Sequence, residues 1–308
     1  MARKINGGIY PTMITPYKRS GEIDFDNVRK LVDWYIEKGC SGIFAVCQSS
    51  EMVYLSLKER VALAEAVVDQ ANGRINVVAS GHCGNSIEEQ AKEMDEISKT
   101  GVDAFVLVSN RFDYHNDGDD VFIENAERLF DKANKDISLG IYECPYPYKR
   151  LLSPRIIDWI KENPRFKFIK DTCCDPVALK YRGEALAGTE CLLFNANEQT
   201  ALYSLQNGGS GYSGIMANFH PDLLVWLYEN YKTNPEKAEK LSNILSMMAF
   251  TENPAYPCTA KYYLGFEGFR METLARSSDE KRLTPYQKYT VEQMYALNND
   301  LRKAFLED

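Results

Sequence analysis

The strongest constraint on the fold is a regular alternation between short apolar runs and longer segments with helical periodicity. Eight apolar runs are expected to form strands, at residues 8–14, 42–47, 75–80, 104–109, 138–142, 166–170, 191–195 and 211–215. Their starts lie roughly 20 to 35 residues apart, which is the size of a βα unit. The alternation therefore predicts an α/β protein with a parallel sheet.

The segments between the runs carry the apolar stripe of amphipathic helices. Val28, Leu31, Val32, Tyr35 and Ile36 show it with the spacing i, i+3, i+4, i+7 and i+8. Eight βα units of this length favour a (β/α)8 TIM barrel over an open sheet. No G-x-G-x-x-G motif follows the first run, so nothing indicates a dinucleotide-binding crevice.

The last part of the chain has helical patterning without a clear strand. Residues 220–231 are expected to form the eighth barrel helix, and residues 235–305 to pack as further helices. We therefore predict a barrel domain at residues 1–232 and a C-terminal helical extension at residues 233–308. The Asn-Pro pair at 253–254 and the Tyr-Pro pair at 256–257 are expected to mark a break between two helices of the extension.

Composition narrows the classes of partner and location. The formal net charge of −8 argues against a nucleic-acid partner, because phosphate binding needs a clustered basic face. No apolar stretch reaches the roughly 18 residues of a membrane-spanning helix, and the N-terminus does not resemble a signal peptide. Eight Cys occur without a C-x-x-C motif, mostly inside apolar runs. These features predict reduced thiols in a cytoplasmic protein without a membrane partner.

The sixth predicted strand ends in a lysine. With a period of two, Phe166, Phe168 and Lys170 share one face, so Lys170 would point into the barrel at its C-terminal mouth. Partial desolvation there would lower the pKa of the amine and free it as a nucleophile. The alternative is a solvated lysine with Asp171 as its ion partner.

The fifth predicted strand places a phenol beside this amine. Ser138, Gly140 and Tyr142 would face the lumen, and the small residues would leave room for a substrate. Tyr142 would lie close to Lys170 on the neighbouring strand, where its hydroxyl can move protons during imine formation. The alternative is an ordinary aromatic residue at a strand end.

A metal centre is a rival hypothesis. The three histidines, His82, His115 and His220, all follow predicted strands and would lie on the catalytic rim. Neither an H-x-H motif nor a cluster of strand-end carboxylates accompanies them. We therefore expect no metal and no other cofactor.

Five segments now make a family resemblance visible: residues 12–17 (TMITPY), 46–51 (VCQSSE), 142–145 (YECP), 169–171 (IKD) and 195–198 (NANE). Over residues 7–260 the chain resembles the dihydrodipicolinate synthase and N-acetylneuraminate lyase superfamily of class I, pyruvate-type aldolases. The pairing of Y-x-x-P with I-K-D at this separation is the most specific part of the resemblance.

The resemblance implies a Schiff-base mechanism and a homotetramer built from dimers. Lys170 would form an imine with the ketone of a 2-oxo acid, and Tyr142 would protonate and deprotonate the alkoxide. The turn of Gln48, Ser49 and Ser50 would hold the substrate carboxylate, since consecutive backbone N–H groups form an anion-binding nest.

Several positions depart from the family pattern. Gln48 replaces a Ser or Thr, Phe112 replaces an interface Tyr whose role Tyr114 would have to take, and Pro147 replaces a carboxylate-binding Arg. Lys149, Arg150 or Arg111 would have to supply the missing positive charge.

The remaining site candidates concern the rest of the substrate. Glu143, Asn195 and Asn197 are polar groups suited to substrate hydroxyls, and the alternative for each is a strand-end polar group that is satisfied within the protein. Glu198 is retained from the lyase pattern, and Ile215 stands where a lyase Ser contacts the sugar chain. We therefore expect a lyase or aldolase acting on a 2-oxo acid and an aldehyde, with a 2-keto sugar acid or an N-acetylneuraminate-like substrate. The alternatives are dihydrodipicolinate synthase, a keto-deoxy sugar acid dehydratase, and a non-catalytic member that binds a 2-oxo acid.

Overall fold

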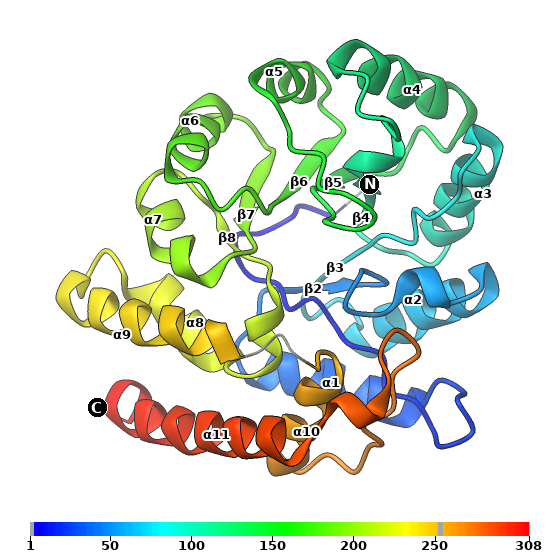
Figure 1. Ribbon diagram of the computed structural model, residues 1–308. Helices are drawn as coiled ribbons and strands as arrows, with labels where there is room; N and C mark the ends of the chain where they lie inside the picture. The colour runs from blue at the N-terminus through cyan, green and yellow to red at the C-terminus, as the bar shows by residue number, and fades with distance from the viewer. Residues whose placement is uncertain (1–2, 252–254, 308) are drawn as a thin grey trace.

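The computed structural model describes residues 3–251 and 255–307, and its centre is a parallel barrel (Figure 1). The eight strands are β1 (Gly8–Ile9), β2 (Gly42–Ala45), β3 (Asn76–Ala79), β4 (Ala104–Val108), β5 (Leu139–Tyr142), β6 (Phe166–Asp171), β7 (Leu192–Asn195) and β8 (Gly211–Tyr212). They pair in the order β1-β8-β7-β6-β5-β4-β3-β2, and a parallel bridge from Thr12 to Phe44 joins β1 to β2. The predicted (β/α)8 barrel is thus confirmed.

Eight helices surround the strands: α1 (Phe25–Glu37), α2 (Leu57–Ala71), α3 (Ile87–Ser98), α4 (Asp119–Lys132), α5 (Pro154–Glu162), α6 (Pro176–Leu186), α7 (Ala201–Gln206) and α8 (Pro221–Asn230). Local sequence explains where they begin. Ser56 and Ser86 each form a capping box with the glutamate three residues later, which satisfies backbone donors of the first turn.

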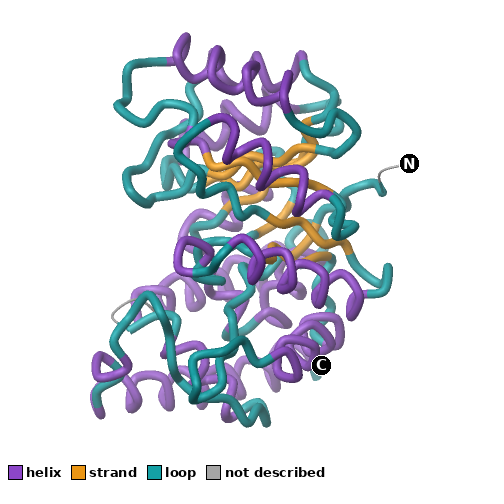
Figure 2. Tube along the Cα trace, turned by 90° about the vertical axis from the view of Figure 1, so that its right-hand side faces the viewer, coloured by secondary structure: helices purple, strands orange, loops and turns teal. Residues whose placement is uncertain are grey.

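Three further helices, α9 (Pro235–Met248), α10 (Cys258–Phe266) and α11 (Pro285–Leu306), follow the barrel. They lie along one side of it, with α11 next to α10 and α8 (Figures 1 and 2). Trp226 of α8 packs edge-on against Phe305 of α11. The predicted boundary at 232/233 falls between α8 and α9 and stays a prediction. Tyr256 and Pro257 directly precede α10, whereas residues 253 and 254 lie outside the described residues.

The eighth strand is shorter than predicted. It ends at Tyr212, and Ile215 begins a 3-10 helix, η4 (Ile215–Asn218). Ser213 donates its N–H to the carbonyl of Asn195, 2.8 Å away, and this is the last bond of the ladder. Ile215 therefore lies on the mouth of the barrel instead of in the strand.

Aromatic rings fill the barrel lumen below the mouth. Phe168 stacks on Phe194 with 4.5 Å between ring centres. Tyr10 and Phe44 both pack against the Phe168 ring. A Cβ on Gly140 would lie 3.0 Å from Val106 and 3.2 Å from Phe168. The small residue therefore makes space for these side chains, and the expectation that it leaves room for a substrate is wrong.

A β-bulge between β5 and β6 changes which face of the sheet the first side chains of β6 point to. Leu139 pairs with Phe166, but its neighbour Gly140 pairs with Phe168. Phe166 consequently points outward and packs on Trp159, with 5.4 Å between ring centres. The prediction that Phe166 faces the lumen is wrong, while Phe168 does face it as expected.

Within the described residues, no helix combines the length and the apolar character needed to cross a membrane.

Candidate active site

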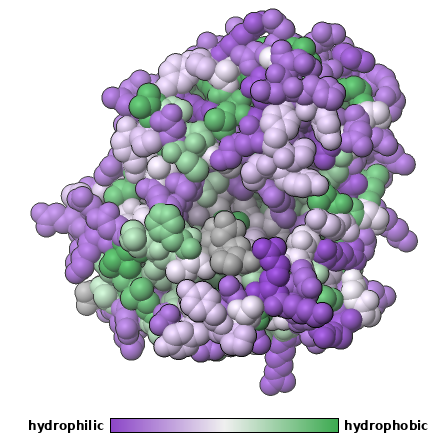
Figure 3. Space-filling view, in the orientation of Figure 1, coloured by the Kyte–Doolittle hydropathy of each residue, from purple (hydrophilic) through white to green (hydrophobic). Residues whose placement is uncertain are grey.

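A cavity of about 670 Å³ opens at the C-terminal mouth of the barrel. The ends of β4, β5, β6 and β8 and the loops that follow several strands contribute to its walls, as barrel enzymes arrange their sites. Figure 3 shows this side of the molecule, with polar and apolar side chains around a central hollow. The cavity is far larger than a three-carbon acid needs, so it has space for a longer substrate.

Lys170 lies at the inner end of this cavity. Lys170 is only 5% exposed. Its Nζ lies 4.1 Å from the centre of the Tyr142 ring and 5.7 Å from the centre of the Phe44 ring. Burial lowers the pKa of the Lys170 ammonium group to about 8. Asp171 does not pair with it, because its carboxylate forms an ion pair with Arg182. The alternative of a solvated lysine paired with Asp171 is therefore wrong.

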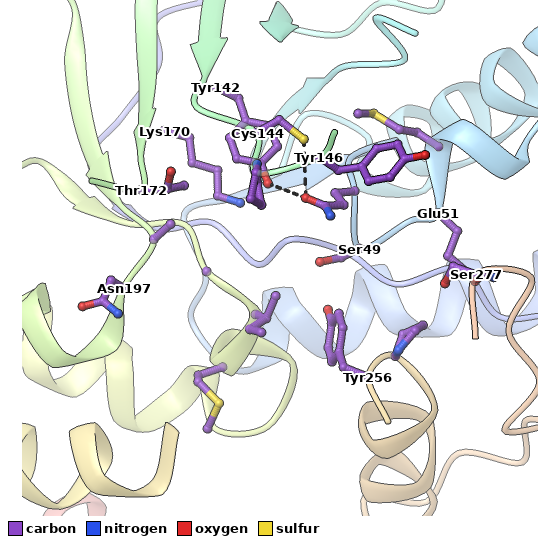
Figure 4. Close-up of a pocket in the computed structure, with 18 of the residues that line it drawn as sticks. Ser49, Glu51, Tyr142, Cys144, Tyr146, Lys170, Thr172, Asn197, Tyr256 and Ser277 are labelled. Atoms are coloured by element: carbon purple, nitrogen blue, oxygen red, sulfur yellow. Dashed lines mark hydrogen bonds between the residues drawn. The ribbon is translucent and has the colours of Figure 1, made fainter. Parts of the chain in front are cut away.

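Tyr142 lies opposite Lys170 on the neighbouring strand, and the two residues are register partners. Its hydroxyl donates a hydrogen bond to the Gln48 carboxamide oxygen at 3.0 Å, and the Cys144 thiol donates to the same oxygen at 3.4 Å (Figure 4). Burial raises the pKa of Tyr142 well above its usual value. The phenol therefore stays protonated at neutral pH and is held in one orientation.

The turn after β2 presents Gln48 and Ser49 to the cavity. Ser50 does not line it. Its hydroxyl donates to the Met13 carbonyl at 2.6 Å and accepts the Cys47 N–H at 3.1 Å. The Ser50 side chain thus holds the turn in shape, and the part expected of its backbone N–H in carboxylate binding stays a prediction. The Ser49 hydroxyl donates to Thr12 at 3.1 Å and remains on the cavity wall.

Glu143 points away from the cavity. Its carboxylate forms an ion pair with Arg182 at 2.8 Å and accepts the N–H groups of Leu152 and Thr172 at 2.7 and 2.8 Å. A buried carboxylate needs such partners, and these use both of its oxygens. This corrects the expectation that Glu143 binds a substrate hydroxyl. The sequence motif could not reveal the partner, which comes from α6.

Of the site residues predicted at the ends of β7 and β8, some line the cavity and one does not. Asn197, Glu198 and Ile215 line the cavity. Asn195 does not, because its side chain accepts the Asn197 N–H at 2.6 Å and donates to Thr200 at 2.9 Å. This corrects the expected substrate contact of Asn195, which shapes the loop that carries Asn197 and Glu198.

Of the three basic residues considered as replacements for the missing Arg, only Arg111 lines the cavity. It donates to the Asn85 side chain at 3.0 Å, and its buried Nε has no partner within the described residues. Arg150 pairs with Asp113 and Asp119, each at 2.7 Å, and Lys149 donates to the Thr172 carbonyl. Arg111 therefore brings a guanidinium group to the cavity, and neither Lys149 nor Arg150 does so.

The loop after β4 does not bring Tyr114 to the cavity. Phe112 is buried against His82 and Phe122, whereas Tyr114 is exposed on the surface. Phe112 has no hydroxyl group, and within a single chain the Tyr114 hydroxyl does not replace the one that the family pattern has at position 112.

The histidines do not lie together. His82 accepts the Val108 N–H at 2.9 Å, and burial lowers its pKa to about 3; His115 is exposed, and His220 contacts Glu198. Among the residues that the structure describes, no group of three or more His, Cys, Asp or Glu could hold a metal ion.

The C-terminal extension supplies one wall of the cavity, which sequence reasoning missed. Phe250, Tyr256 and Ser277 line it together with barrel residues. Because they lie far along the chain from the strand ends, no local pattern could have placed them there.

Glu51 ties the extension to the turn that carries Ser49. Its carboxylate accepts the N–H groups of Arg276 and Ser277 at 2.7 and 2.6 Å and lies 3.7 Å from Nζ of Lys261. Lys261 is 1% exposed, and burial lowers its pKa to about 8. This latch, formed by Glu51, Lys261, Arg276 and Ser277, fixes the extension against the cavity.

The chain is similar in sequence to curated proteins that are described as 4-hydroxy-tetrahydrodipicolinate synthases. The chain is 26% identical to the 4-hydroxy-tetrahydrodipicolinate synthase of Pseudoalteromonas atlantica and 29% identical to that of Methanocaldococcus jannaschii. Each alignment covers 84% of this chain and 88% of the relative.

Solved structures share the fold. The sialic acid aldolase of Ruminococcus gnavus superposes with a TM-score of 0.86 at 20% identity, covering 97% of this chain and 99% of the other. A prophage protein of the dihydrodipicolinic acid synthase family from E. coli K12, in complex with pyruvate, gives a TM-score of 0.82 at 20% identity, with 96% and 98% covered.

The match to the family itself runs over residues 6–297, nearly the whole chain. It confirms the resemblance seen in the five sequence segments and, at the level of the family, the expectation of a class I aldolase or lyase. The chain belongs to the dihydrodipicolinate synthetase family.

Proposed function

We propose that this protein is an aldolase or lyase that activates a 2-oxo acid as an imine on Lys170. The observation that carries the proposal is the environment of Lys170: a buried amine with a pKa lowered to about 8, next to a protonated phenol, inside a large cavity. An amine of this kind is neutral often enough near neutral pH to attack a ketone.

The cavity provides the groups for each step. Lys170 attacks the ketone carbon, and the ketone oxygen takes one proton from the amine and one from Tyr142 and leaves as water, which gives a protonated imine. In cleavage the ionised Tyr142 then regains its proton from the hydroxyl group on C4, which becomes the aldehyde oxygen. The turn with Gln48 and Ser49 holds the carboxylate by its backbone N–H groups and the Ser49 hydroxyl. The resulting iminium draws electrons from the C3–C4 bond, so that bond breaks or forms with an aldehyde as the second partner.

We infer further that the second partner is oxygen-rich, as in a 2-keto sugar acid. Asn197, Glu198 and Arg111 line the cavity and offer acceptors and donors for hydroxyl or carboxylate groups, while Ile215 adds an apolar contact. The related proteins named above are described as 4-hydroxy-tetrahydrodipicolinate synthases and a sialic acid aldolase, both compatible with a 2-oxo acid on Lys170. The cytoplasmic location stays a prediction from the sequence, and the homotetramer stays an expectation from the family resemblance, which sedimentation velocity tests.

Borohydride trapping tests the proposal. The protein is incubated with pyruvate, reduced with borohydride and analysed by peptide mass mapping. We expect a stable adduct on the peptide that contains Lys170 and none for Lys170→Met. The matched control is Lys261→Met, which removes the other deeply buried lysine of lowered pKa and should leave the label in place. No adduct in the native protein over a panel of 2-oxo acids would overturn the proposal.

A further inference from the structure

The Gln48 carboxamide connects two loops at the inner part of the cavity. Gln48 follows β2, yet its Oε1 accepts a hydrogen bond from the Tyr142 hydroxyl at 3.0 Å and another from the Cys144 thiol at 3.4 Å (Figure 4). Reversing the amide would aim its N–H2 group at two groups that already carry protons. These two contacts therefore fix which end of the carboxamide faces β5.

The nitrogen of the same carboxamide is left as an accessible donor. Tyr142 and Cys144 are buried, whereas Gln48 is exposed and lines the cavity. Within residues 3–251 and 255–307, Nε2 of Gln48 has no hydrogen-bond partner, because both contacts of the carboxamide use its oxygen. A molecule in the cavity can thus accept a hydrogen bond from Nε2 next to the Tyr142 hydroxyl.

A carboxamide differs chemically from the Ser or Thr hydroxyl that the family pattern has at position 48. It neither takes up nor passes on a proton near neutral pH, so Gln48 gives the Tyr142 proton no route away from the substrate. After Tyr142 has lost its proton, its oxygen faces the acceptor oxygen of Gln48, and this disfavours the phenolate. Tyr142 therefore regains its proton most readily from a substrate hydroxyl group beside it.

We propose that the Gln48 N–H2 group is a catalytic donor that holds the C4 oxygen of a 4-hydroxy-2-oxo acid while Tyr142 exchanges a proton with that oxygen. The inference rests on the proposed function, because it assumes the imine on Lys170. In cleavage the C4 hydroxyl proton passes to ionised Tyr142, the C4–O double bond forms, and the electron pair of the C3–C4 bond moves into the iminium to give an enamine. Negative charge builds on the C4 oxygen during this step, and a fixed donor stabilises it.

Two reactions of the full chain separate this role from simple support of Tyr142. Cleavage of 4-hydroxy-2-oxopentanoate has an oxygen on C4, whereas exchange of the pyruvate methyl protons in D2O proceeds through the same imine without one. Gln48→Glu keeps an oxygen facing Tyr142 and removes the N–H2 group. We expect kcat for cleavage to fall about 100-fold or more, with a smaller change in KM, because the contact strengthens in the transition state. Exchange at saturating pyruvate should remain near the native rate.

Gln48→Met provides the second variant. It removes both ends of the carboxamide, so exchange should slow together with cleavage, because Tyr142 also loses its acceptor. Equal losses of exchange and cleavage in Gln48→Glu would mean that Gln48 only supports Tyr142 and would overturn the inference. So would a native protein that exchanges pyruvate protons but cleaves neither 4-hydroxy-2-oxopentanoate nor 4-hydroxy-2-oxoglutarate. Absence of both exchange and borohydride labelling in the native protein would instead refute the proposed function itself.

Discussion

The amine of Lys170 lies over the ring of Tyr142, with 4.1 Å between Nζ and the ring centre. Two influences on the Lys170 pKa oppose one another at this contact. The ring face stabilises an ammonium group by roughly 0.5–2 kcal/mol, whereas complete burial disfavours the charge. Burial is the stronger influence, because the Lys170 pKa is lowered to about 8. The contact therefore keeps the amine next to its proton donor without restoring its full basicity.

The pKa of Lys170 predicts how imine formation depends on pH. Only the neutral amine attacks a ketone, and its fraction rises as pH increases towards and through 8. Labelling by pyruvate and borohydride should therefore accelerate about tenfold per pH unit below 8 and level off above it. Initial labelling rates between pH 6 and 10 measure this. A midpoint above pH 10 would show that Lys170 is an ordinary solvated lysine.

Removing the Tyr142 hydroxyl should slow turnover while the imine still forms. Tyr142→Phe eliminates the proton donor next to Lys170, and general acid–base catalysis contributes about 10²- to 10⁴-fold. Steady-state kinetics and mass labelling together separate the two steps. The control is Tyr146→Phe on the same loop, because Tyr146 is 54% exposed at the rim. Equal effects of the two substitutions would argue against a proton-transfer role for Tyr142.

Arg111→Met should affect substrates that carry a second carboxylate more than neutral ones. Arg111 is the guanidinium that lines the cavity, and a hydrogen bond to a charged group contributes roughly 1.5–3 kcal/mol. We expect KM for a carboxylate-bearing aldehyde to rise at least about tenfold, with little change for propanal. Arg155→Met, which removes an exposed arginine paired with Asp120, is the control. An unchanged ratio between the two aldehydes would exclude this role for Arg111.

The buried network around Arg182 should be essential for stability. Arg182 pairs with both Glu143 and Asp171, and all three side chains are buried. Arg182→Met leaves two carboxylates without their cation, which costs roughly 3–5 kcal/mol. Urea unfolding should report this loss, and Arg155→Met, at an exposed ion pair, should cost at most about 1 kcal/mol. A loss of the same size in both variants would contradict the structural role assigned to Glu143.

Disrupting the latch should loosen the wall of the cavity that the extension forms. Glu51→Ala removes the acceptor for the N–H groups of Arg276 and Ser277 and leaves Lys261 without a carboxylate partner. Hydrogen exchange at the amides of residues 276 and 277 should become faster, and KM for the 2-oxo acid should rise because Ser49 lies in the same turn. Glu59→Ala, which removes the Arg276 side-chain pair and the Ser56 capping box but keeps the acceptor of these two amides, should leave them protected.

The sequence alone was sufficient to predict the barrel and the places of Lys170 and Tyr142 at its mouth. Strand length, helical periodicity and the βα spacing are local properties, so they could be read without knowing the tertiary contacts. The same holds for Lys170 and Tyr142: each ends an apolar run, and parallel strands in a barrel bring their C-terminal ends to one mouth. The family segments supported the same residues.

Only the tertiary structure decided which polar neighbours face the cavity. Glu143 follows Tyr142 directly, yet Arg182 from α6 binds it outside the cavity. The bulge between β5 and β6 turned Phe166 outward, although its spacing from Lys170 indicated the lumen. Tyr256 and Ser277 reach the cavity from the C-terminal extension. Each of these outcomes depends on contacts between residues that are distant in sequence. A buried charge or ring needs partners, and only the tertiary fold determines which residues supply them.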